Sequence, residues 1–460
     1  MMNDWKGKHL VILGAARQGL ALARYLSKRG TEITITDQKE EQVLSTVQER
    51  FQGNVNWVLG SHPLELLDTA DGLSLSGGIP LSIPLVRTAL QRGIPLTNDS
   101  QIFMELVPCL VIGITGSAGK TTTTLLVGKM VEDAYGKEQS WVGGNIGNPL
   151  IAVLDQIKSD HIAVMELSSF QLELMTKSPA IACVTNVTPN HLDRHGTMEE
   201  YIRVKTHILD FQTGTDVAVL NREDLGSWNL RSRVQGRLES FGVDRPGPEQ
   251  AGSYLEGENI CYWDGKSSRI LLPIRSIKLR GEHNLMNVLA ACAIAKVAGI
   301  SEDSIKKGVE ALEGIEHRLE FVRSWHGADW INDSIATAPE RSIAAIHSFE
   351  EPLVLLAGGR DKDLPWGEFA DLVQERVKSV ILFGEAADLV EDALLLAQKE
   401  GKLGVPYIKC AGLEDAVQQA AEIIQSGEVV LLSPGGTSFD EFEDFAERGE
   451  YFRQCVQKLN

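Results

Sequence analysis

The most constraining feature of this 460-residue sequence is the stretch from Val111 to Thr124, which reads VIGITGSAGKTTTT. A short apolar run ends in a glycine-rich turn, and Lys120 and Thr121 then open a pattern typical of a helix. A strand, a glycine turn and a helix N-terminus together bind phosphate, because backbone N–H groups and the helix dipole face the anion. Lys120 would reach the outer phosphates, and the Thr121 hydroxyl would hold Mg²⁺.

The spacing of this loop departs by one residue from the common pattern GxxxxGK[ST], because position 114 is Ile. An ordinary glycine-rich turn is the alternative, but Gly-Lys-Thr between an apolar run and a helical pattern favours a phosphate loop. The apolar run His161–Glu166 predicts a strand that ends in a carboxylate. A carboxylate there, beside a phosphate loop, is suited to be a Mg²⁺ ligand.

Composition limits the class of protein. The chain has 63 acidic and 44 basic residues and a net charge of −19, which argues against a nucleic-acid-binding surface. Its six cysteines are scattered without a CxxC pair, so they are expected to be buried free thiols rather than disulfides or zinc ligands. No signal peptide and no apolar run near the membrane-spanning length is visible, so we expect a cytoplasmic protein.

Three α/β segments are expected from the length and from alternating strand and helix patterns. Residues 1–107 begin with the strand 9–13, a turn at Gly14 and Gly19, and a second strand ending at Asp37, which is a Rossmann-like start. The glycine fingerprint is incomplete, so a nucleotide such as a uridine diphosphate, or no ligand at all, remains possible alongside a dinucleotide. A strand before Gly77-Gly78 is a second place where backbone could approach a diphosphate.

The middle segment, 108–314, contains the phosphate loop, a polar glycine-rich turn expected at 141–147, and a buried strand at 181–187. His191 follows that strand, and Lys205 lies on the next expected helix, so the two could converge on one site. Taken alone, His191 could equally be a loop histidine, and for Lys205 alone a solvated helix lysine is the favoured interpretation. Asn284 and Asn287 lie on the first turn of an alanine-rich helix, where they could contact a base or cap the helix.

The last segment, 315–460, alternates strands and helices again. Its strands lead into polar turns at 332–334, 358–362 and 433–438. In an open α/β sheet, ligands bind at such carboxyl ends of strands. Base and ribose contacts would have to come from Asn284, Arg318 and Asp333, because no NKxD motif is visible; that would put the nucleotide at a domain interface.

Beyond these local patterns, a series of motifs along the whole chain resembles the Mur ligase family. They are ITGSAGKTT, GGNIG (143–147), ELSSFQLE (166–173), TNVTPNHLDRHG (185–196), YxxxK ending at Lys205, GEHNxxN (281–287), EHRLE (316–320), NDSxAT (332–337) and LLSP…SFDEF…RG (431–449). ELSSFQLE is typical of the branch that adds D-glutamate. The resemblance implies a UDP-binding Rossmann-like domain, a central P-loop ATPase domain and a Rossmann-like amino-acid-binding domain.

The resemblance also implies the activity. ATP phosphorylates the carboxylate of UDP-N-acetylmuramoyl-L-alanine, and the amine of D-glutamate then displaces phosphate, a step of peptidoglycan synthesis. The implied partners are those two substrates, with no nucleic acid and no membrane, and the implied enzyme is a cytoplasmic monomer that uses ATP and two Mg²⁺ sites.

Site residues follow from the resemblance, position by position. Three are catalytic: Lys120, His191 and Lys205. The metal ligands are Thr121, Glu166, His191 and Lys205, the last as a carbamate. ATP contacts are Gly116, Ser117, Ala118, Gly119, Lys120, Thr121, Thr122, Asn284, Asn287, Arg318 and Asp333, with His317 nearby. UDP-substrate contacts are Gly14, Ala15, Ala16, Arg17, Asp37, Gln38, Lys39, Ser76, Gly77, Gly78 and Asn145. Glutamate contacts are Thr337, Lys362, Ser438, Phe439 and Phe445.

Some positions depart from the pattern of the family. Position 335 is Ile where a lysine is usual, Ser117-Ala118 replaces Thr-Asn, Gly77 replaces Pro, and Gly435-Gly436-Thr437 replaces the usual small residues Ala-Cys-Ala. Losing the lysine removes a positive charge from the glutamate pocket, so Lys362 acts alone or the pocket is reshaped. D-glutamate, L-glutamate and another acidic amino acid therefore stay open, as does an ATPase switch that acts on a protein partner. An NAD-dependent dehydrogenase is disfavoured, because it leaves the phosphate loop unexplained.

Overall fold

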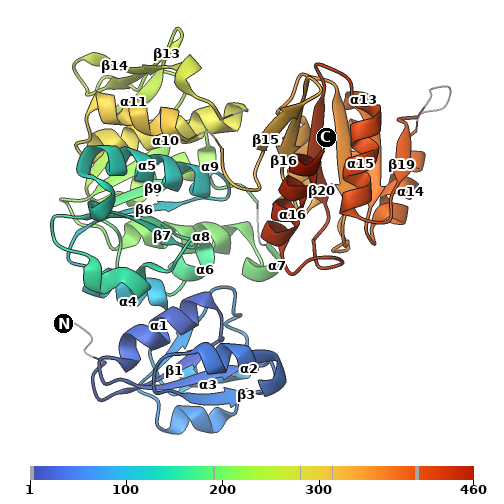
Figure 1. The fold of residues 1–460 in the computed structure, drawn as a ribbon. Helices are drawn as coiled ribbons and strands as arrows, with labels where there is room; N and C mark the ends of the chain where they lie inside the picture. The colour runs from blue at the N-terminus through green and yellow to red at the C-terminus, as the bar shows by residue number, and fades with distance from the viewer. Residues whose placement is uncertain (1–4, 190–191, 280, 313, 399–403, 460) are drawn as a thin grey trace. The chain divides into compact units, whose positions relative to one another are not determined.

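The computed structural model describes residues 5–189, 192–279, 281–312, 314–398 and 404–459. Within these residues the strands form three sheets, of five, nine and six strands, and helices pack along them (Figure 1). The chain divides into two compact units, Met1–Ile277 with His283–Ala311, and Lys278–Glu282 with Leu312–Asn460. The α/β fold with three domains is confirmed, while the exact limits at 107/108 and 314/315 stay predictions.

The first sheet is parallel throughout, in the order β3-β2-β1-β4-β5. Its strands are β1 (His9–Leu13), β2 (Glu32–Asp37), β3 (Asn56–Leu59), β4 (Gly72–Leu75) and β5 (Leu96–Thr97), and its helices are α1 (Arg17–Ser27), α2 (Glu41–Arg50) and α3 (Pro84–Gln91). Chain order reverses between β1 and β4, so the crevice where such sheets bind ligands lies at the carboxyl ends of these two strands.

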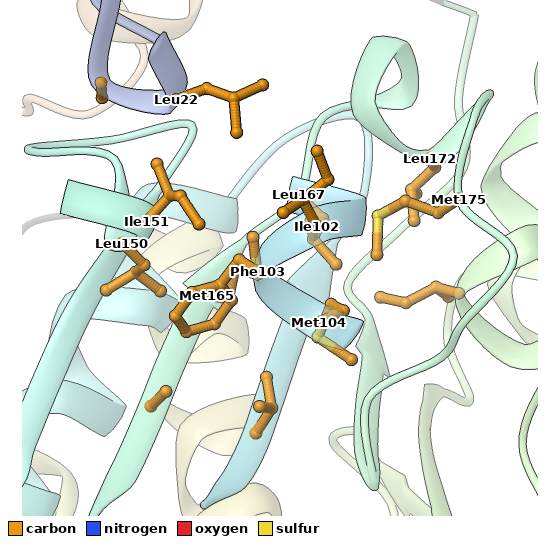
Figure 2. Packing of buried hydrophobic residues seen from close by; sticks show 14 of the residues in the cluster. Leu22, Ile102, Phe103, Met104, Leu150, Ile151, Met165, Leu167, Leu172 and Met175 are labelled. Carbon is orange, nitrogen blue, oxygen red and sulfur yellow. The ribbon is translucent and has the colours of Figure 1, made fainter. Parts of the chain in front are cut away.

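Helix α4 (Asp99–Leu106) packs against the middle part of the first unit (Figure 2). Its Ile102 and Phe103 are fully buried in one hydrophobic cluster with Met165 and Leu167. Leu22 of α1 belongs to the same cluster and lies near Ile151 (Figure 2). The apolar contacts therefore join the first sheet to the second within this unit.

The second sheet has the order β14-β13-β12-β11-β10-β9-β6-β8-β7 and is parallel except for the hairpins β12–β13 and β13–β14. Its strands are β6 (Leu110–Thr115), β7 (Ser140–Gly144), β8 (Ile162–Glu166), β9 (Ile181–Val184), β10 (Val217–Asn221), β11 (Arg237–Phe241), β12 (Ala251–Glu256), β13 (Asn259–Trp263) and β14 (Ser268–Pro273). The helices with it are α5 (Lys120–Tyr135), α6 (Ser169–Leu172), α7 (Leu192–His195), α8 (Met198–Asp210), α9 (Leu225–Trp228), α10 (Glu282–Val297) and α11 (Glu302–Ala311).

The turn expected at 141–147 is wrong over its first half, because β7 continues to Gly144 and forms the edge of the sheet. The glycines suggested a turn, since glycine weakens a strand. In this strand the glycines allow close packing instead. A Cβ on Gly143 would lie 2.6 Å from the carbonyl oxygen of Asn148, and a Cβ on Gly144 would lie 2.4 Å from the carbonyl oxygen of Glu166. The strand expected at 181–187 is shorter than predicted and ends at Val184.

The third sheet forms the second unit, in the order β15-β16-β20-β17-β18-β19. Only the β15–β16 pair is antiparallel. Its elements are β15 (Glu320–Trp325), β16 (Ala328–Asn332), α12 (Pro339–Ile346), β17 (Leu353–Gly358), α13 (Gly367–Arg376), β18 (Val377–Phe383), α14 (Ala387–Ala397), β19 (Tyr407–Lys409), α15 (Leu413–Ile423), β20 (Val429–Gly435) and α16 (Phe445–Lys458).

Two expectations about the whole chain can be compared with this fold. All six cysteines carry free thiols, as expected from their spacing, but burial is confirmed for only four of them, because Cys109 and Cys410 are partly exposed. None of the helices in the described part of the chain combines the length and the apolarity that a bilayer-crossing helix needs.

Candidate active site

The stretch 111–124 forms the predicted strand, loop and helix, with Gly116–Gly119 between β6 and α5. Two glycines are required by close approach. A Cβ on Gly116 would lie 1.9 Å from Thr185 Oγ1, and one on Gly119, whose φ is +80°, would lie 2.2 Å from Asn287 Oδ1. The loop is therefore confined between the segment that follows β9 and the second turn of α10.

The loop is also tied to the segment after β9 by hydrogen bonds. The N–H groups of Ser117 and Ala118 donate to the carbonyl and the side-chain oxygen of Asn186, at 2.9 and 2.8 Å. The Thr185 hydroxyl donates to the Ala118 carbonyl at 2.6 Å. Lys120 Nζ donates to the carbonyls of Gly116 and Ser117, at 3.0 and 3.2 Å, so the positive charge of Lys120 lies over the loop.

Glu166 forms the acidic side of this site. Its side chain is 1% exposed, accepts from Thr121 Oγ1 at 2.8 Å and from Asn145 Nδ2 at 2.9 Å, and comes from β8, which lies between β6 and β7 in the sheet. A carboxylate and a hydroxyl are ligand types that Mg²⁺ prefers. Among the described residues no three His, Cys, Asp or Glu side chains cluster as a metal site.

Lys205 on α8 is 1% exposed and donates to the Gly116 carbonyl at 2.8 Å. Its ammonium lies 4.7 Å from the centre of the Tyr201 ring. Burial, and then the positive charge of Lys120, hold the pKa of Lys205 well below its usual range, against the opposite effect of Glu166. A lysine that loses its proton easily is a nucleophile, which is the form that CO₂ carbamylates.

His191 lies outside the described residues, so its convergence with Lys205 stays a prediction. Its neighbour Arg194 on α7 donates to the Ile79 carbonyl and lies 3.9 Å from Glu173. A segment next to the predicted metal ligand is thereby linked to the loop after β4.

The predicted UDP-substrate residues gather at the carboxyl ends of β2, β1 and β4, which are adjacent in the sheet. The Ala15 N–H donates to Asp37 Oδ2 at 2.7 Å, and the Ser76 hydroxyl donates to the Gly14 carbonyl at 2.9 Å. Arg17 donates to the Asn145 carbonyl at 3.3 Å. The remaining members of the set continue these three turns: Ala16, Gln38, Lys39, Gly77 and Gly78.

A small pocket opens beside this edge, between the residues 75–81 and the residues 170–174. Asp99 at the start of α4 lines it, and burial raises the pKa of that carboxyl to about 7. Sequence reasoning missed Asp99, since a lone acid at a helix start is normally a surface feature.

Asn284 and Asn287 lie buried on the first two turns of α10, one turn apart, and Asn287 Nδ2 donates to Asn284 Oδ1 at 3.0 Å. Because Asn287 faces Gly119, this predicted ATP contact is adjacent to the phosphate loop.

In the second unit, Asp333 directly follows β16 and is buried. It accepts from the Ser433 hydroxyl at 2.9 Å and from the Leu319 N–H at 3.2 Å. Burial raises the pKa of Asp333 to about 7, against the opposite effects of Arg318 and Arg341. Arg318 thus lies within electrostatic reach of Asp333, as is expected if both contact the same nucleotide. The neighbouring His317 has a φ of +62°.

Comparison with known proteins gives three matching domain families: "Mur ligase MurD-like, N-terminal domain" over residues 8–98, "Mur ligase middle domain" over 114–295, and "Mur ligase, glutamate ligase domain" over 317–436. The UDP-N-acetylmuramoylalanine–D-glutamate ligase of Acetivibrio thermocellus is 37% identical and covers 100% of this chain and 99% of its own. That of Symbiobacterium thermophilum is 39% identical over 98% of each chain.

The chain belongs to the Mur ligase family. Solved structures agree at the level of the fold. The UDP-N-acetylmuramate–alanine ligase MurC of Thermotoga maritima superposes with a TM-score of 0.60 at 18% identity, covering 98% of this chain and 99% of that one.

The predicted glutamate residues of this Mur ligase lie after three strands that are neighbours in the sheet, β16, β20 and β17. Thr337 follows β16, Lys362 follows β17, and Ser438 follows β20. Phe439 and Phe445 are 60% and 36% exposed.

Sequence reasoning missed Arg448, which holds two of these segments of the Mur ligase together. It is fully buried, and its guanidinium donates to the Ser334 hydroxyl and carbonyl and to the carbonyls of Gly436 and Thr437, at 2.9–3.1 Å. Burial lowers the pKa of Arg448 to about 10. The available signal was its place in the RG pair of the last motif.

Proposed function

We propose that this Mur ligase joins D-glutamate to UDP-N-acetylmuramoyl-L-alanine at the expense of ATP, in peptidoglycan synthesis. The supporting observation is the phosphate loop with Thr121, Glu166 and the buried Lys205 around it, in a chain whose full-length relatives at 34–39% identity carry the name of that ligase. The enzyme would work in the cytoplasm, as a monomer, without a nucleic-acid or membrane partner.

The reaction has two steps. A carboxylate oxygen of the UDP-linked substrate attacks the γ-phosphorus of ATP, which forms an acyl phosphate and releases ADP. The amine of D-glutamate then attacks the carbonyl carbon, an amide bond forms through a tetrahedral intermediate, and phosphate leaves while the amine loses its proton. Both steps bring anions together, so the site must neutralise negative charge.

We assign the roles of the residues from the family resemblance, and the positions described above support part of this assignment. Lys120 moves from the loop carbonyls to the phosphates when ATP binds, and Asn287 supports the same loop. Thr121 and Glu166 would hold one Mg²⁺, and Lys205, once carbamylated, would hold a second with His191. Bound Mg²⁺ supplies positive charge to the phosphoryl oxygens. Arg318 and Asp333 bind the base and ribose, and Thr337, Lys362 and Ser438 bind D-glutamate.

The test is phosphate release by the purified protein with Mg-ATP and UDP-N-acetylmuramoyl-L-alanine, with D-glutamate, L-glutamate or no amino acid. Release that depends on D-glutamate is expected. Release with L-glutamate alone keeps the mechanism and changes the specificity. Equal release in all three arms contradicts ligation and indicates an uncoupled ATPase.

A further inference from the structure

The loops at the carboxyl edge of the third sheet lie against one another. Arg448 joins the segment after β16 to the segment after β20 through the carbonyls of Ser334 and Gly436. Arg360 and Thr437 then exchange two backbone hydrogen bonds of 2.8 Å, which place the loop after β17 against the loop after β20. Lys362, two residues beyond Arg360, is therefore near the loop that follows β16.

Arg341 reaches the same place from the first turn of α12. Its side chain is exposed, and Nη1 donates to the Ile335 carbonyl at 3.2 Å. The same carbonyl accepts from the Thr337 N–H at 2.9 Å. The guanidinium of Arg341 is thereby anchored to the loop that carries Thr337, which belongs to the predicted glutamate contacts.

Two positive side chains, those of Arg341 and Lys362, lie within electrostatic reach of one another here. Arg341 contributes to the lowered pKa of Lys362, after burial of that ammonium, so the two charges are within electrostatic reach. Neither makes an ion pair with a carboxylate among the residues that the structure describes, although the chain has 63 acidic and 44 basic residues. The one acid that Arg341 is seen to influence is Asp333, which is buried and has its pKa raised to about 7. Adjacent cations that make no ion pair cost free energy in the empty protein and favour a bound anion.

We propose that Arg341 binds a carboxylate of the incoming acidic amino acid, alongside Lys362. This inference rests on the proposed function and adds a specificity-determining residue to it. Position 335, where the family pattern has a lysine, is Ile in this chain, and the Arg341 guanidinium lies at the backbone of that very residue. Arg341 would therefore restore the second positive charge of the pocket from a neighbouring helix.

Steady-state kinetics on four variants of the full-length protein test the inference. Arg341→Ala removes the charge and the hydrogen bond to Ile335. Arg341→Gln keeps a donor for that bond but not the charge, and Arg341→Lys keeps the charge without the planar fork. Lys458→Ala, an exposed cation at the end of α16, is the matched control.

For Arg341→Ala and Arg341→Gln we expect the KM for D-glutamate to rise about 10- to 100-fold, as for a lost charge-assisted hydrogen bond, with the KM values for ATP and the UDP-linked substrate unchanged. Arg341→Lys should show a smaller rise, and Lys458→Ala none. A wild-type KM in Arg341→Gln, or a parallel rise for all three substrates, would overturn the inference and leave a structural role. A wild-type protein without glutamate-dependent phosphate release would instead overturn the proposed function.

Discussion

The phosphate-loop region of the first unit and the carboxyl edge of the third sheet place their charges in opposite ways. In the first region Lys205 and Glu166 are each 1% exposed, and the loop is fixed by hydrogen bonds and by contacts that leave no room for a Cβ at Gly116 or Gly119. In the second region Arg341 and Lys362 are exposed, and a single buried residue, Arg448, organises the loops.

The difference is what we would expect from the two chemical tasks proposed above for these regions. Phosphoryl transfer is accelerated by charges that are already in place and dry, since such groups need no reorganisation during the reaction. An amino acid that must enter for each turnover needs accessible charges, which are weaker individually because water screens them. Substitutions in the first region should therefore abolish activity, and those in the second should change affinity or stability.

The largest effect is expected for Lys205→Ala. The variant should lose activity about a thousandfold, close to 4 kcal/mol in the barrier, because it removes a buried group next to the phosphate loop. Added bicarbonate should not restore the loss, since no amine remains to be carbamylated. Phosphate release is the measurement, and Lys129→Ala, an exposed lysine on α5 paired with Glu132, is the control. Full activity in Lys205→Ala would remove this lysine from the site.

The next effect concerns stability of the second unit. Arg448→Met keeps the volume of the side chain but leaves the carbonyls of Ser334, Gly436 and Thr437 without their donor. We expect a loss of about 3 kcal/mol in the free energy of unfolding, since buried acceptors lose their partner. Urea unfolding followed by tryptophan fluorescence measures it. A midpoint equal to that of Lys458→Met would show that the buried guanidinium does not organise this edge.

The two regions also differ in how much could be predicted from the sequence. The phosphate loop could be located because its residues are contiguous and each has a local reason, such as a glycine turn or a helix start. Arg341 and Arg448 could not, because their roles depend on β16, β20 and β17 being neighbours, which the chain order does not reveal. The prediction of a turn at 141–147 was partly wrong for a related reason, because the glycines in β7 allow close packing against residues that are distant in the sequence.

A smaller effect is expected when a methyl group enters the phosphate loop. Gly119→Ala places a Cβ 2.2 Å from Asn287 Oδ1 at a φ of +80°. Asn287 can move only by giving up its bond to Asn284, so the KM for ATP should rise about 30-fold, near 2 kcal/mol. Gly136→Ala at the other end of α5 is a matched control, with a φ of +92° and nothing within 4 Å of its Cβ. Equal ATP kinetics in both variants would mean that the contact with Asn287 is unimportant.

The last test uses two buried acids, one in each unit, whose pKa values burial raises to about 7. Asp99 retains a proton in the folded state that the unfolded chain loses near pH 4, so its contribution to stability is complete below pH 4 and is lost as the pH rises through 7. Asp99→Asn removes this loss. At pH 8 the variant should be more stable than wild type, by up to about 4 kcal/mol in the free energy of unfolding for a shift of about three pKa units, and the difference should vanish near pH 4. Asp333→Asn should gain nothing, because the amide cannot accept from both the Ser433 hydroxyl and the Leu319 N–H. Thermal unfolding across this pH range would distinguish the two variants. A pH-independent shift in Asp99→Asn would mean that the carboxyl of Asp99 is ionised in the folded protein. The first unit would then contain a buried charge with a partner rather than a neutral acid.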